Sequence, residues 1–341
     1  MKHLRLLAVL TAMMMFVVAC TGDGAGSPGA DESDDAAASV PAASEAAEVP
    51  DELVIGFVPS READALVETI QPVADALEDA LGIPVEGIVS TDYTALVEAM
   101  NTGQAQIGAF GPFSLLQARD RAGAEIILQS ERFGSATYHT QFMTNNPDKY
   151  CDEEPVVVDE ETGFQNCNGT ETAETGPVAL DKVALIEEGT TVAFVEEASA
   201  SGYIFPATIL KQQGIDYVSG IEPLFAGGHD TSVVAVCEGD AEVGVAFDDA
   251  RGAAETDCDV ANNVVVFAYG PEIPNDGWAV AGDLPDELKE QIKQALLDYA
   301  ATEEGQATLE SIYEITGLVE ADEEAFGIVE DAAAELGIEG D

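Results

Sequence analysis

Positive charge is scarce in this sequence. Its 341 residues include 12 Lys and Arg but 66 Asp and Glu, which gives a formal net charge of −54 at pH 7. A field of this sign repels the phosphates of nucleic acids and the surfaces of anionic membranes, so the composition argues against both as binding partners. Solvated acidic faces are the ordinary explanation for such a composition.

Long apolar runs are also scarce, and the clearest one lies at the N-terminus. A basic start is followed by an apolar run over residues 6–18, which is typical of an export signal. This run is shorter than the ~20 residues that a membrane-spanning helix needs. Val17-Val18-Ala19-Cys20 resembles the bacterial lipobox, so we predict a signal peptide over residues 1–19 and a lipidated Cys20. An uncleaved membrane helix and an ordinary cleaved signal are the alternatives.

Bulky apolar side chains are nearly missing from residues 20–50, where Val40 and Val49 are the exceptions. A segment rich in Ala, Ser, Gly, Asp, Glu and Pro cannot bury enough surface to fold. We therefore predict a flexible tether between the membrane and the folded part. The remaining residues, 51–341, are enough for one large domain or two lobes of ordinary size.

Cysteine is rare as well. Apart from Cys20, the sequence contains Cys151, Cys167, Cys237 and Cys258. In an oxidising exported setting, this even number predicts two disulfides, most simply Cys151–Cys167 and Cys237–Cys258, although four cysteines allow three connectivities. No thiol then remains for catalysis. Neither a CxxC pair nor clustered histidines occur, so we predict no metal site.

After the tether, short apolar runs alternate with amphipathic segments, which is typical of β-α units on a largely parallel sheet. Pro72 lies within the first expected helix and argues against its continuity. The expected strands are residues 53–58, 85–89, 105–110, 125–129, 137–144, 191–195, 222–225, 241–247, 263–268 and 278–280. The expected helices are residues 64–81, 93–100, 112–119, 201–213, 229–237 and 285–300, with further helical segments up to the C-terminus.

Extended segments near residues 137–144 and 264–280 separate two sets of β-α units. We therefore expect two lobes joined by two crossover strands, with a ligand cleft between them. The first lobe is predicted to contain residues 51–138 and 277–341, and the second residues 139–276. Within the second lobe, residues 145–175 interrupt the alternation and carry two of the cysteines, so we predict a surface insertion stapled by its own disulfide.

Two strand-to-helix junctions have the composition of an anion site. Ser199-Ala200-Ser201-Gly202 follows a strand and opens a helix, where free amides, hydroxyls and a glycine suit a tetrahedral anion. Gly227-Gly228-His229 precedes a second helix, and the imidazole of His229 can bond a ligand oxygen. Helix capping by a serine and a structural histidine are the alternatives. Tyr93, at a third helix start, is either a phenolic donor to the cleft or a core aromatic.

These stretches together resemble the phosphate, phosphite and phosphonate binding proteins of ABC importers, the PhnD-like family. The resemblance covers roughly residues 52–300. Its motifs are Tyr93-Thr94-Ala95-Leu96-Val97-Glu98-Ala99-Met100, Gly111-Pro112, Ser199-Ala200-Ser201-Gly202-Tyr203, Ala226-Gly227-Gly228-His229-Asp230 and Ile273-Pro274-Asn275-Asp276. It implies an α/β, two-lobed type II periplasmic-binding-protein fold that closes on its ligand.

The resemblance also implies ligand-binding roles by position. Tyr93 and Tyr138 are similar to tyrosines that face the ligand, and Ser199 and Ser201 lie in the loop that holds the phosphonyl oxygens. Ala200 departs from the pattern because many relatives have Thr or Ser there, so one hydroxyl donor is lost.

Three further positions follow from the same resemblance. His229 matches a histidine that bonds a ligand oxygen. Asp276 is similar to an acid that accepts from a protonated ligand oxygen or pairs with a ligand amine. Asp249 resembles, less closely, a position that meets the organic group in binders of aminophosphonates.

The shortage of basic residues bears on how an anion is held. Removing Lys2 and Arg5 with the signal leaves ten Lys and Arg, and none of them lies within these motifs. We therefore expect neutral donors to hold the anion, with no cation in the site. An acid such as Asp276 would then favour an oxyanion that keeps a proton.

The sequence thus predicts a non-enzymatic binding lipoprotein outside the cytoplasm, a monomer without cofactors. It captures phosphite, phosphonate or phosphate and delivers it to an ABC permease and ATPase. A binder of sulfonates or other small anions with the same fold is the nearest alternative, and a ligand-sensing lipoprotein is another. An exported hydrolase with Ser199 or Ser201, His229 and Asp276 as a triad is disfavoured because no Gly-x-Ser-x-Gly elbow occurs.

Overall fold

The computed structural model describes residues 48–61, 63–172 and 176–338. The predicted signal peptide, Cys20 and most of the predicted tether lie outside these residues. Within the described ranges, no helix has the length and apolar character to cross a membrane.

The first sheet has six strands in the order β13-β4-β12-β3-β1-β2. Strands β1, β2 and β3 run parallel, and β12 lies antiparallel between β3 and β4. The helices of this part of the chain contact one another as two groups, α1 with α9 and α10, and α2 with α3. The strands are Leu53–Phe57 (β1), Val85–Val89 (β2), Ile107–Phe110 (β3), Glu125–Glu131 (β4), Gly277–Val280 (β12) and Gly317–Val319 (β13). The helices are Ala63–Leu81 (α1), Tyr93–Asn101 (α2), Pro112–Ala122 (α3), Asp286–Ala300 (α9) and Glu303–Tyr313 (α10).

The second sheet has seven strands in the order β6-β7-β11-β5-β10-β8-β9. Strand β8 is parallel to both β9 and β10, whereas β5 is antiparallel to β10 and β11. The strands are Thr137–Thr144 (β5), Val156–Val157 (β6), Gln165–Asn166 (β7), Thr191–Phe194 (β8), Glu222–Phe225 (β9), Val243–Phe247 (β10) and Val265–Pro274 (β11). The helices are Pro147–Tyr150 (α4), Leu180–Val183 (α5), Phe205–Gln212 (α6), His229–Glu238 (α7), Val260–Asn263 (α8) and Gly327–Leu336 (α11). Short 3-10 segments are Thr170–Thr172 (η1), Ala250–Ala253 (η3) and Glu323–Phe326 (η4), and Ala200–Ile204 (η2) is a π-helical turn.

The central strands of both sheets are apolar and buried, as expected when helices cover both faces of a sheet. Four of the five residues of β1 and all five of β10 are buried. Near-continuous burial is typical of strands that have helices on both faces, and it accounts for the short apolar runs of the sequence. Pro72 does not interrupt its helix, since α1 continues from Ala63 to Leu81.

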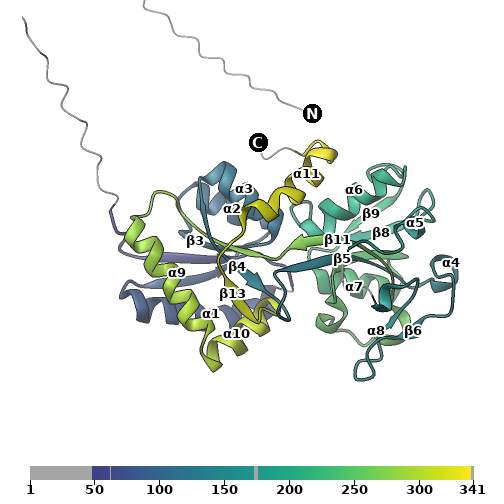
Figure 1. Cartoon of the computed structure of the whole chain (residues 1–341), viewed down its shortest axis with the longest axis horizontal. Coiled ribbons are helices and arrows are strands. Elements are labelled where there is room, and N and C mark those ends of the chain that lie inside the picture. The colour runs from purple at the N-terminus through teal and green to yellow at the C-terminus, as the bar shows by residue number, and fades with distance from the viewer. Residues whose placement is uncertain (1–47, 62, 173–175, 339–341) are drawn as a thin grey trace, which may run out of the picture. The chain divides into compact units, whose positions relative to one another are not determined.

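Two chain segments cross between the sheets, as the sequence predicts. One joins β4 to β5, and the other joins β11 to β12 (Figure 1). They lie side by side, because the Asn275 backbone amide donates to Ala136 O over 2.8 Å and the Asn275 side chain donates to Ser135 O over 2.9 Å. Strand β11 is longer than expected and follows β5 through two register shifts. The structure therefore has the two-lobed α/β fold with paired crossovers.

A third segment links the two sheets near the C-terminus. After β13 the chain enters η4 and α11, and α11 packs against α6, where Thr208 Oγ1 donates to Ala332 O over 3.0 Å. The same helix is ion-paired with α3 through Arg119 and Glu330, 2.8 Å apart. Figure 1 shows α11 over the junction between the two sheets. The residue boundaries predicted for the two lobes stay a prediction.

Both disulfides of the simplest expected pairing, Cys151–Cys167 and Cys237–Cys258, are present in the structure. The segment predicted as a surface insertion, residues 145–175, also contributes to the second sheet, because β7 within it pairs with β11. The buried Arg251 anchors β7 by donating to Gln165 O and to Asn166 Oδ1, each over 2.8 Å.

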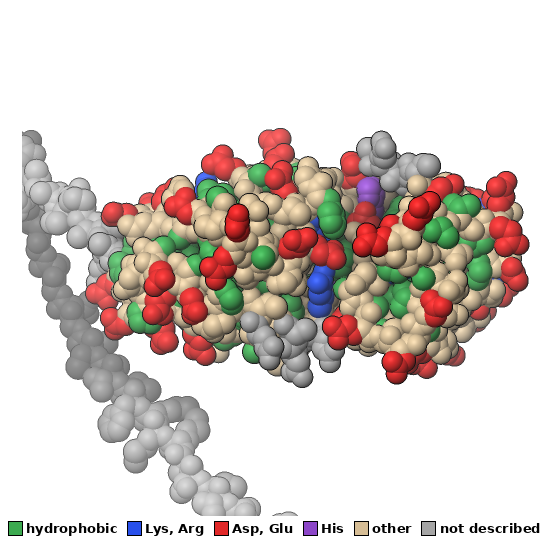
Figure 2. Space-filling view, turned by 90° about the horizontal axis from the view of Figure 1, so that it is seen from below, with side chains coloured by type: hydrophobic (Ala, Val, Ile, Leu, Met, Phe, Trp, Pro, Cys, Tyr) green, Lys and Arg blue, Asp and Glu red, His purple; other side chains and the backbone are tan. Residues whose placement is uncertain are grey.

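The surface reflects the unbalanced charge of the sequence. Figure 2 shows acidic side chains over the whole visible face, whereas basic side chains are few and gather mainly near its middle. An anion that approaches this face is repelled by most of it, so a binding site for an anion needs strong local donors.

Candidate functional site

The first sheet brings several expected residues to one edge. Strand β1 is followed by Val58 and Ser60, β2 by Tyr93 at the start of α2, and β3 by Gly111-Pro112 at the start of α3. Because β1, β2 and β3 are parallel, these residues all lie at the carboxyl ends of their strands. In open α/β sheets this edge is where ligands bind.

The second sheet contributes in the same way. Ser199, Ala200 and Ser201 follow β8, His229 follows β9, and Phe247 is the last residue of β10. Their strands run parallel, so their carboxyl ends also meet at one edge. The two crossover segments add Arg132 and Asp276 to this group, and the start of β5 adds Tyr138.

These residues enclose a cavity of about 20 Å³. By the same measure a single water molecule needs roughly 10–15 Å³, so the site in this conformation is nearly closed and small. Seven of the eight predicted ligand residues line it, namely Tyr93, Tyr138, Ser199, Ala200, Ser201, His229 and Asp276. The other lining residues are Val58, Ser60, Gly111, Pro112, Arg132 and Phe247.

The serine loop is shaped by its first and last residues. Ser199 caps the helical turn η2, and its Oγ accepts from the Gly202 amide over 3.1 Å. A Cβ at Gly202 would lie 2.4 Å from the side chain of Val195, so only glycine fits this close approach. The amides of Ala200 and Ser201 lie in the first turn and have no intrahelical acceptor. The loop thus presents amides and hydroxyls, which suits an oxyanion.

His229 is held in one protonation state and one tautomer. Burial is the main cause that lowers its pKa to about 3, and the nearby positive charges of Arg132 and Arg61 contribute to this shift. Its Nδ1 accepts from the backbone amide of Phe247 over 3.2 Å, and a backbone amide can only donate. The proton of the neutral ring is therefore on Nε2, which lies 3.4 Å from Ser199 Oγ. His229 thus offers a neutral N–H donor at the cavity.

This tautomer also argues against serine hydrolase chemistry. A general base needs a free ring nitrogen toward the serine and a carboxylate on the other nitrogen. Here Nε2 carries the proton on the side of Ser199, and Nδ1 is bonded to the Phe247 amide rather than to Asp276. The arrangement suits binding of an oxygen atom rather than activation of a nucleophile.

The expectation that the site contains no cation is wrong. Arg132 lines the cavity, is 6% exposed and donates from Nη2 to Asp276 Oδ2 over 3.0 Å. Its guanidinium lies 4.8 Å from the ring centre of Phe247 and 5.6 Å from that of Tyr138. Arg132 lies in the turn between β4 and β5, far in sequence from every motif that resembles the family, so no local pattern indicates it.

Asp276 is the negative member of this pair. Burial raises its pKa, while the positive charges of Arg132 and Arg61 oppose the shift. Burial also raises the pKa of the Tyr93 and Tyr138 phenols, and the charge of Asp276 adds to both shifts. The two phenols therefore stay protonated and available as donors. With Arg132 and Asp276 balanced and His229 neutral, the lining side chains carry no net charge.

Asp249 is not among the residues that line this cavity. Its carboxylate caps η3 and pairs with Arg251, which donates from Nη2 over 2.6 Å and from Nε over 2.9 Å. Gln141 Nε2 lies 3.4 Å from the same carboxylate. Of the predicted ligand residues, Asp249 is thus the one that the structure does not bring to the cavity.

Two hydrogen bonds join the sheets across the cleft. The Tyr93 amide, at the start of α2, donates to Glu196 Oε2 over 3.1 Å, and the His229 amide, at the start of α7, donates to Ser60 O over 3.0 Å. These contacts hold the cleft closed. Neither Glu196 nor Ser60 was predicted from the sequence, although each stands shortly after a predicted strand.

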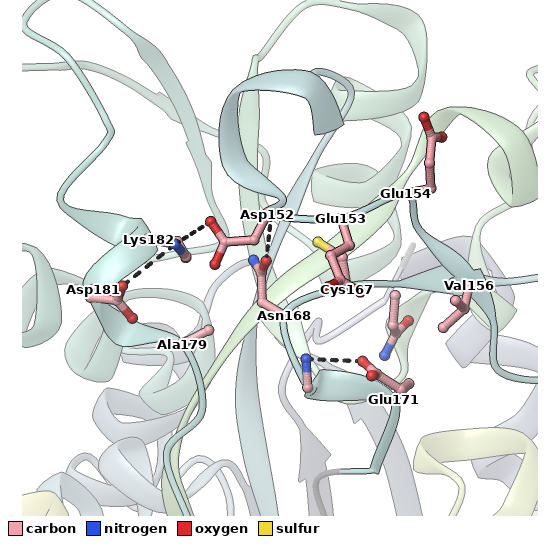
Figure 3. Close-up of a pocket in the computed structure, with 12 residues that line it drawn as sticks. Asp152, Glu153, Glu154, Val156, Cys167, Asn168, Glu171, Ala179, Asp181 and Lys182 are labelled. Carbon is pink, nitrogen blue, oxygen red and sulfur yellow. Dashed lines mark hydrogen bonds and ion pairs between the residues drawn. The ribbon is translucent and has the colours of Figure 1, made fainter.

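A wider cavity of about 470 Å³ lies around residues 145–175 (Figure 3). Its lining includes Glu153, Glu154 and Glu171, and its one basic residue, Lys182, is paired with Asp152 over 2.7 Å. Acidic walls repel an anion. No group of three or more His, Cys, Asp or Glu that could hold a metal ion occurs in the described part of the chain. The small cleft between the sheets is therefore the candidate site.

Comparisons with known sequences show which proteins this chain is similar to. A sequence model of the family described as "ABC transporter, phosphonate, periplasmic substrate-binding protein" matches residues 55–326. The "Phosphate-import protein PhnD" of Mycolicibacterium smegmatis is 27% identical over 208 residues, which span 58% of this chain and 56% of that protein. The match thus spans little more than half of that relative. The "Probable ABC transporter phosphite binding protein PhnD1" of Prochlorococcus marinus is 20% identical over 84% of this chain and 90% of its own length.

Solved structures of similar fold include two phosphonate-related proteins. A binding protein component of an ABC phosphonate transporter from Pseudomonas aeruginosa has a TM-score of 0.68 at 18% identity, covering 84% of this chain and 86% of that one. PhnD1 of Prochlorococcus marinus in complex with methylphosphonate also has a TM-score of 0.68, at 19% identity, covering 85% of this chain and 100% of that one. Identities this low establish the fold alone.

Proposed function

The chain belongs to the family of periplasmic substrate-binding proteins of phosphonate ABC transporters, and on that premise we propose that it captures phosphate, phosphite or a small phosphonate in the cleft between its sheets. The observation that carries the proposal is the small cavity at which the Ser199–Ser201 loop, the Nε2 donor of His229 and the Arg132 guanidinium converge. Amides, hydroxyls, a neutral imidazole and a guanidinium are all donors, and a tetrahedral oxyanion offers only acceptors or a single proton.

The cavity also supports a non-enzymatic role. Closure of two lobes around a ligand is a common switching motion, and it changes the surface that a partner meets. We propose that the closed, loaded form is the one delivered to an ABC permease and its ATPase. The relatives that match this chain are binding components of transporters, which supports transport over sensing.

Lipid attachment is the second part of the proposal. It rests on the sequence around Cys20, which lies outside the described residues. Replacing Cys20 with Ser in the full chain is expected to release the protein from the membrane into the soluble fraction, because the thiol is the site of diacylation. Fractionation with metabolic lipid labelling measures this. A variant that stays membrane-bound and labelled would contradict lipidation at Cys20.

Titration calorimetry of the purified mature protein tests the ligand class. Phosphite, phosphate and methylphosphonate form the panel, with methanesulfonate as the tetrahedral control for the sulfonate alternative. We expect saturable one-to-one binding of at least one phosphorus compound and weaker binding of the sulfonate. Dissociation constants above about 1 mM for all three phosphorus compounds would reject the proposal. Tighter binding of methanesulfonate would favour the sulfonate alternative.

A further inference from the structure

Two carboxylates at or near the site match positions at which the resemblance allows contact with a ligand amine or organic group. They are Asp276, in the cavity, and Asp249, outside it. In this chain each carboxylate is already paired with an arginine, Asp276 with Arg132 and Asp249 with Arg251. Each carboxylate thus already has a cationic partner within the protein.

The Arg132 side chain is fixed in place as well as paired. It is 6% exposed, one nitrogen bonds Asp276, and its guanidinium packs over the rings of Phe247 and Tyr138. Its Nε is buried and has no hydrogen-bond partner among the described residues. A guanidinium packed on aromatic faces and bonded to a carboxylate is a stable arrangement. The pairing is thus part of the site's architecture.

A second arginine adds positive charge near the cavity. The guanidinium of Arg61 lies 6.0 Å from the ring centre of Phe247, and it pairs with Glu314 over 3.1 Å. His229 contributes an N–H donor rather than an acceptor. An ammonium group next to Asp276 would meet the guanidinium of Arg132, and like charges in a buried site repel strongly.

We propose that Arg132 occupies the position of a ligand ammonium group at Asp276, so that the site selects phosphorus oxyanions without an amine and rejects aminoalkylphosphonates. This inference rests on the proposed function of the same cleft. Arg132 is then a specificity-determining residue that acts by repelling the wrong ligand, a common device in selective sites. The small cavity fits the same preference for phosphate, phosphite or a short alkylphosphonate.

The test compares two ligands of equal size that differ in charge, 2-aminoethylphosphonate and propylphosphonate, with methylphosphonate as the reference. Calorimetry of the wild-type mature protein is expected to give at least about tenfold tighter binding of propylphosphonate than of 2-aminoethylphosphonate. In Arg132→Gln the ratio is expected to fall by at least about tenfold, because Asp276 is freed for the ammonium group. Arg132→Lys, which keeps a cation, is expected to keep the discrimination.

Arg121→Gln is the matched control, since Arg121 is exposed on α3 and its loss changes the net charge equally. Equal or tighter binding of 2-aminoethylphosphonate by the wild type would overturn the inference, and so would an unchanged ratio in a folded Arg132→Gln protein. Rejection of both larger ligands by a wild type that binds methylphosphonate would assign the selection to size, again overturning it. If Arg132→Gln does not fold, the wild-type ratio and Arg132→Lys still decide. Failure to bind phosphate, phosphite and methylphosphonate would instead reject the proposed function itself.

Discussion

Glu196 is expected to control how firmly the cleft closes. Its carboxylate accepts from the Tyr93 amide across the cleft, at the N-terminus of α2. A hydrogen bond to a charged group contributes about 1.5–3 kcal/mol, and a negative charge at a helix N-terminus adds about 0.3–1 kcal/mol. Because Glu196 is only partly buried, solvent screening reduces the sum, and we take about 1–2 kcal/mol for its contribution to the closed form.

This free energy converts directly into ligand affinity. If only the closed form holds the ligand tightly, removing about 1–2 kcal/mol from that form lowers its population relative to the open form by about 5- to 30-fold. Glu196→Ala is therefore expected to weaken ligand binding by up to this factor. Glu196→Gln keeps an acceptor oxygen and loses only the charge, so its effect should be smaller.

Titration calorimetry measures the affinities, and small-angle scattering measures the degree of closure with ligand. Glu197→Ala is the matched control, because this neighbouring glutamate is exposed and carries the same charge. If Glu196→Ala and Glu197→Ala both bind ligand with wild-type affinity and close equally, the contact does not stabilise the closed form and the reasoning is refuted.

Three further predictions concern folding and the site. Gly202→Ala is expected to cost about 1–3 kcal/mol of stability and to weaken ligand binding. Gly252→Ala is the control and should change neither, because an added Cβ there meets nothing within 4 Å. Equal melting temperatures of the two variants would contradict this prediction. His229 has a pKa of about 3 in the folded protein and about 6.5 in the unfolded chain, so the unfolded chain binds more protons between these two values. The free energy of unfolding therefore falls as the pH falls from 6.5 to 3, by up to about 1.4 kcal/mol per pH unit. His229→Gln should lack this contribution, so a wild-type-minus-variant difference that does not change from pH 6.5 to 4 would count against a buried neutral imidazole. Replacing Cys237 and Cys258 by Ser removes a disulfide with a sequence separation of 21 residues. This change is expected to lower the free energy of unfolding by about 3 kcal/mol and to leave ligand affinity unchanged. An unchanged denaturation midpoint would argue against the disulfide.

The fold was predictable where its causes are local. Apolar runs and amphipathic spacing predict the strands and helices of both sheets, and the extended segment at residues 137–144 coincides with β5. The C-terminal course was not predictable in the same way. Strand β13 has three residues and depends on pairing with β4, and α11 is placed by contacts with α6 and α3 from distant parts of the chain. Such contacts leave no periodic pattern in the sequence.

The site residues that could be predicted are likewise those whose positions have local causes. Ser199, Ser201 and His229 stand at strand-to-helix junctions, where chain order alone places them at the carboxyl edge of a sheet. Arg132 lies in a turn with no motif of its own, and it meets Asp276 across 144 positions of sequence. The expectation of a site without a cation failed for this reason, since the motifs themselves contain no Lys or Arg. Burial of that pair, rather than the overall charge, sets the local electrostatics.

A crystal structure of the mature protein grown with methylphosphonate tests the central claim most directly. We predict a tetrahedral group in the cleft between the sheets, within hydrogen-bonding distance of the Ser199–Ser201 loop and of His229 Nε2, with Arg132 still paired with Asp276. A closed cleft that is empty while methylphosphonate binds elsewhere on the chain, for example in the acidic cavity around residues 145–175, would contradict the account.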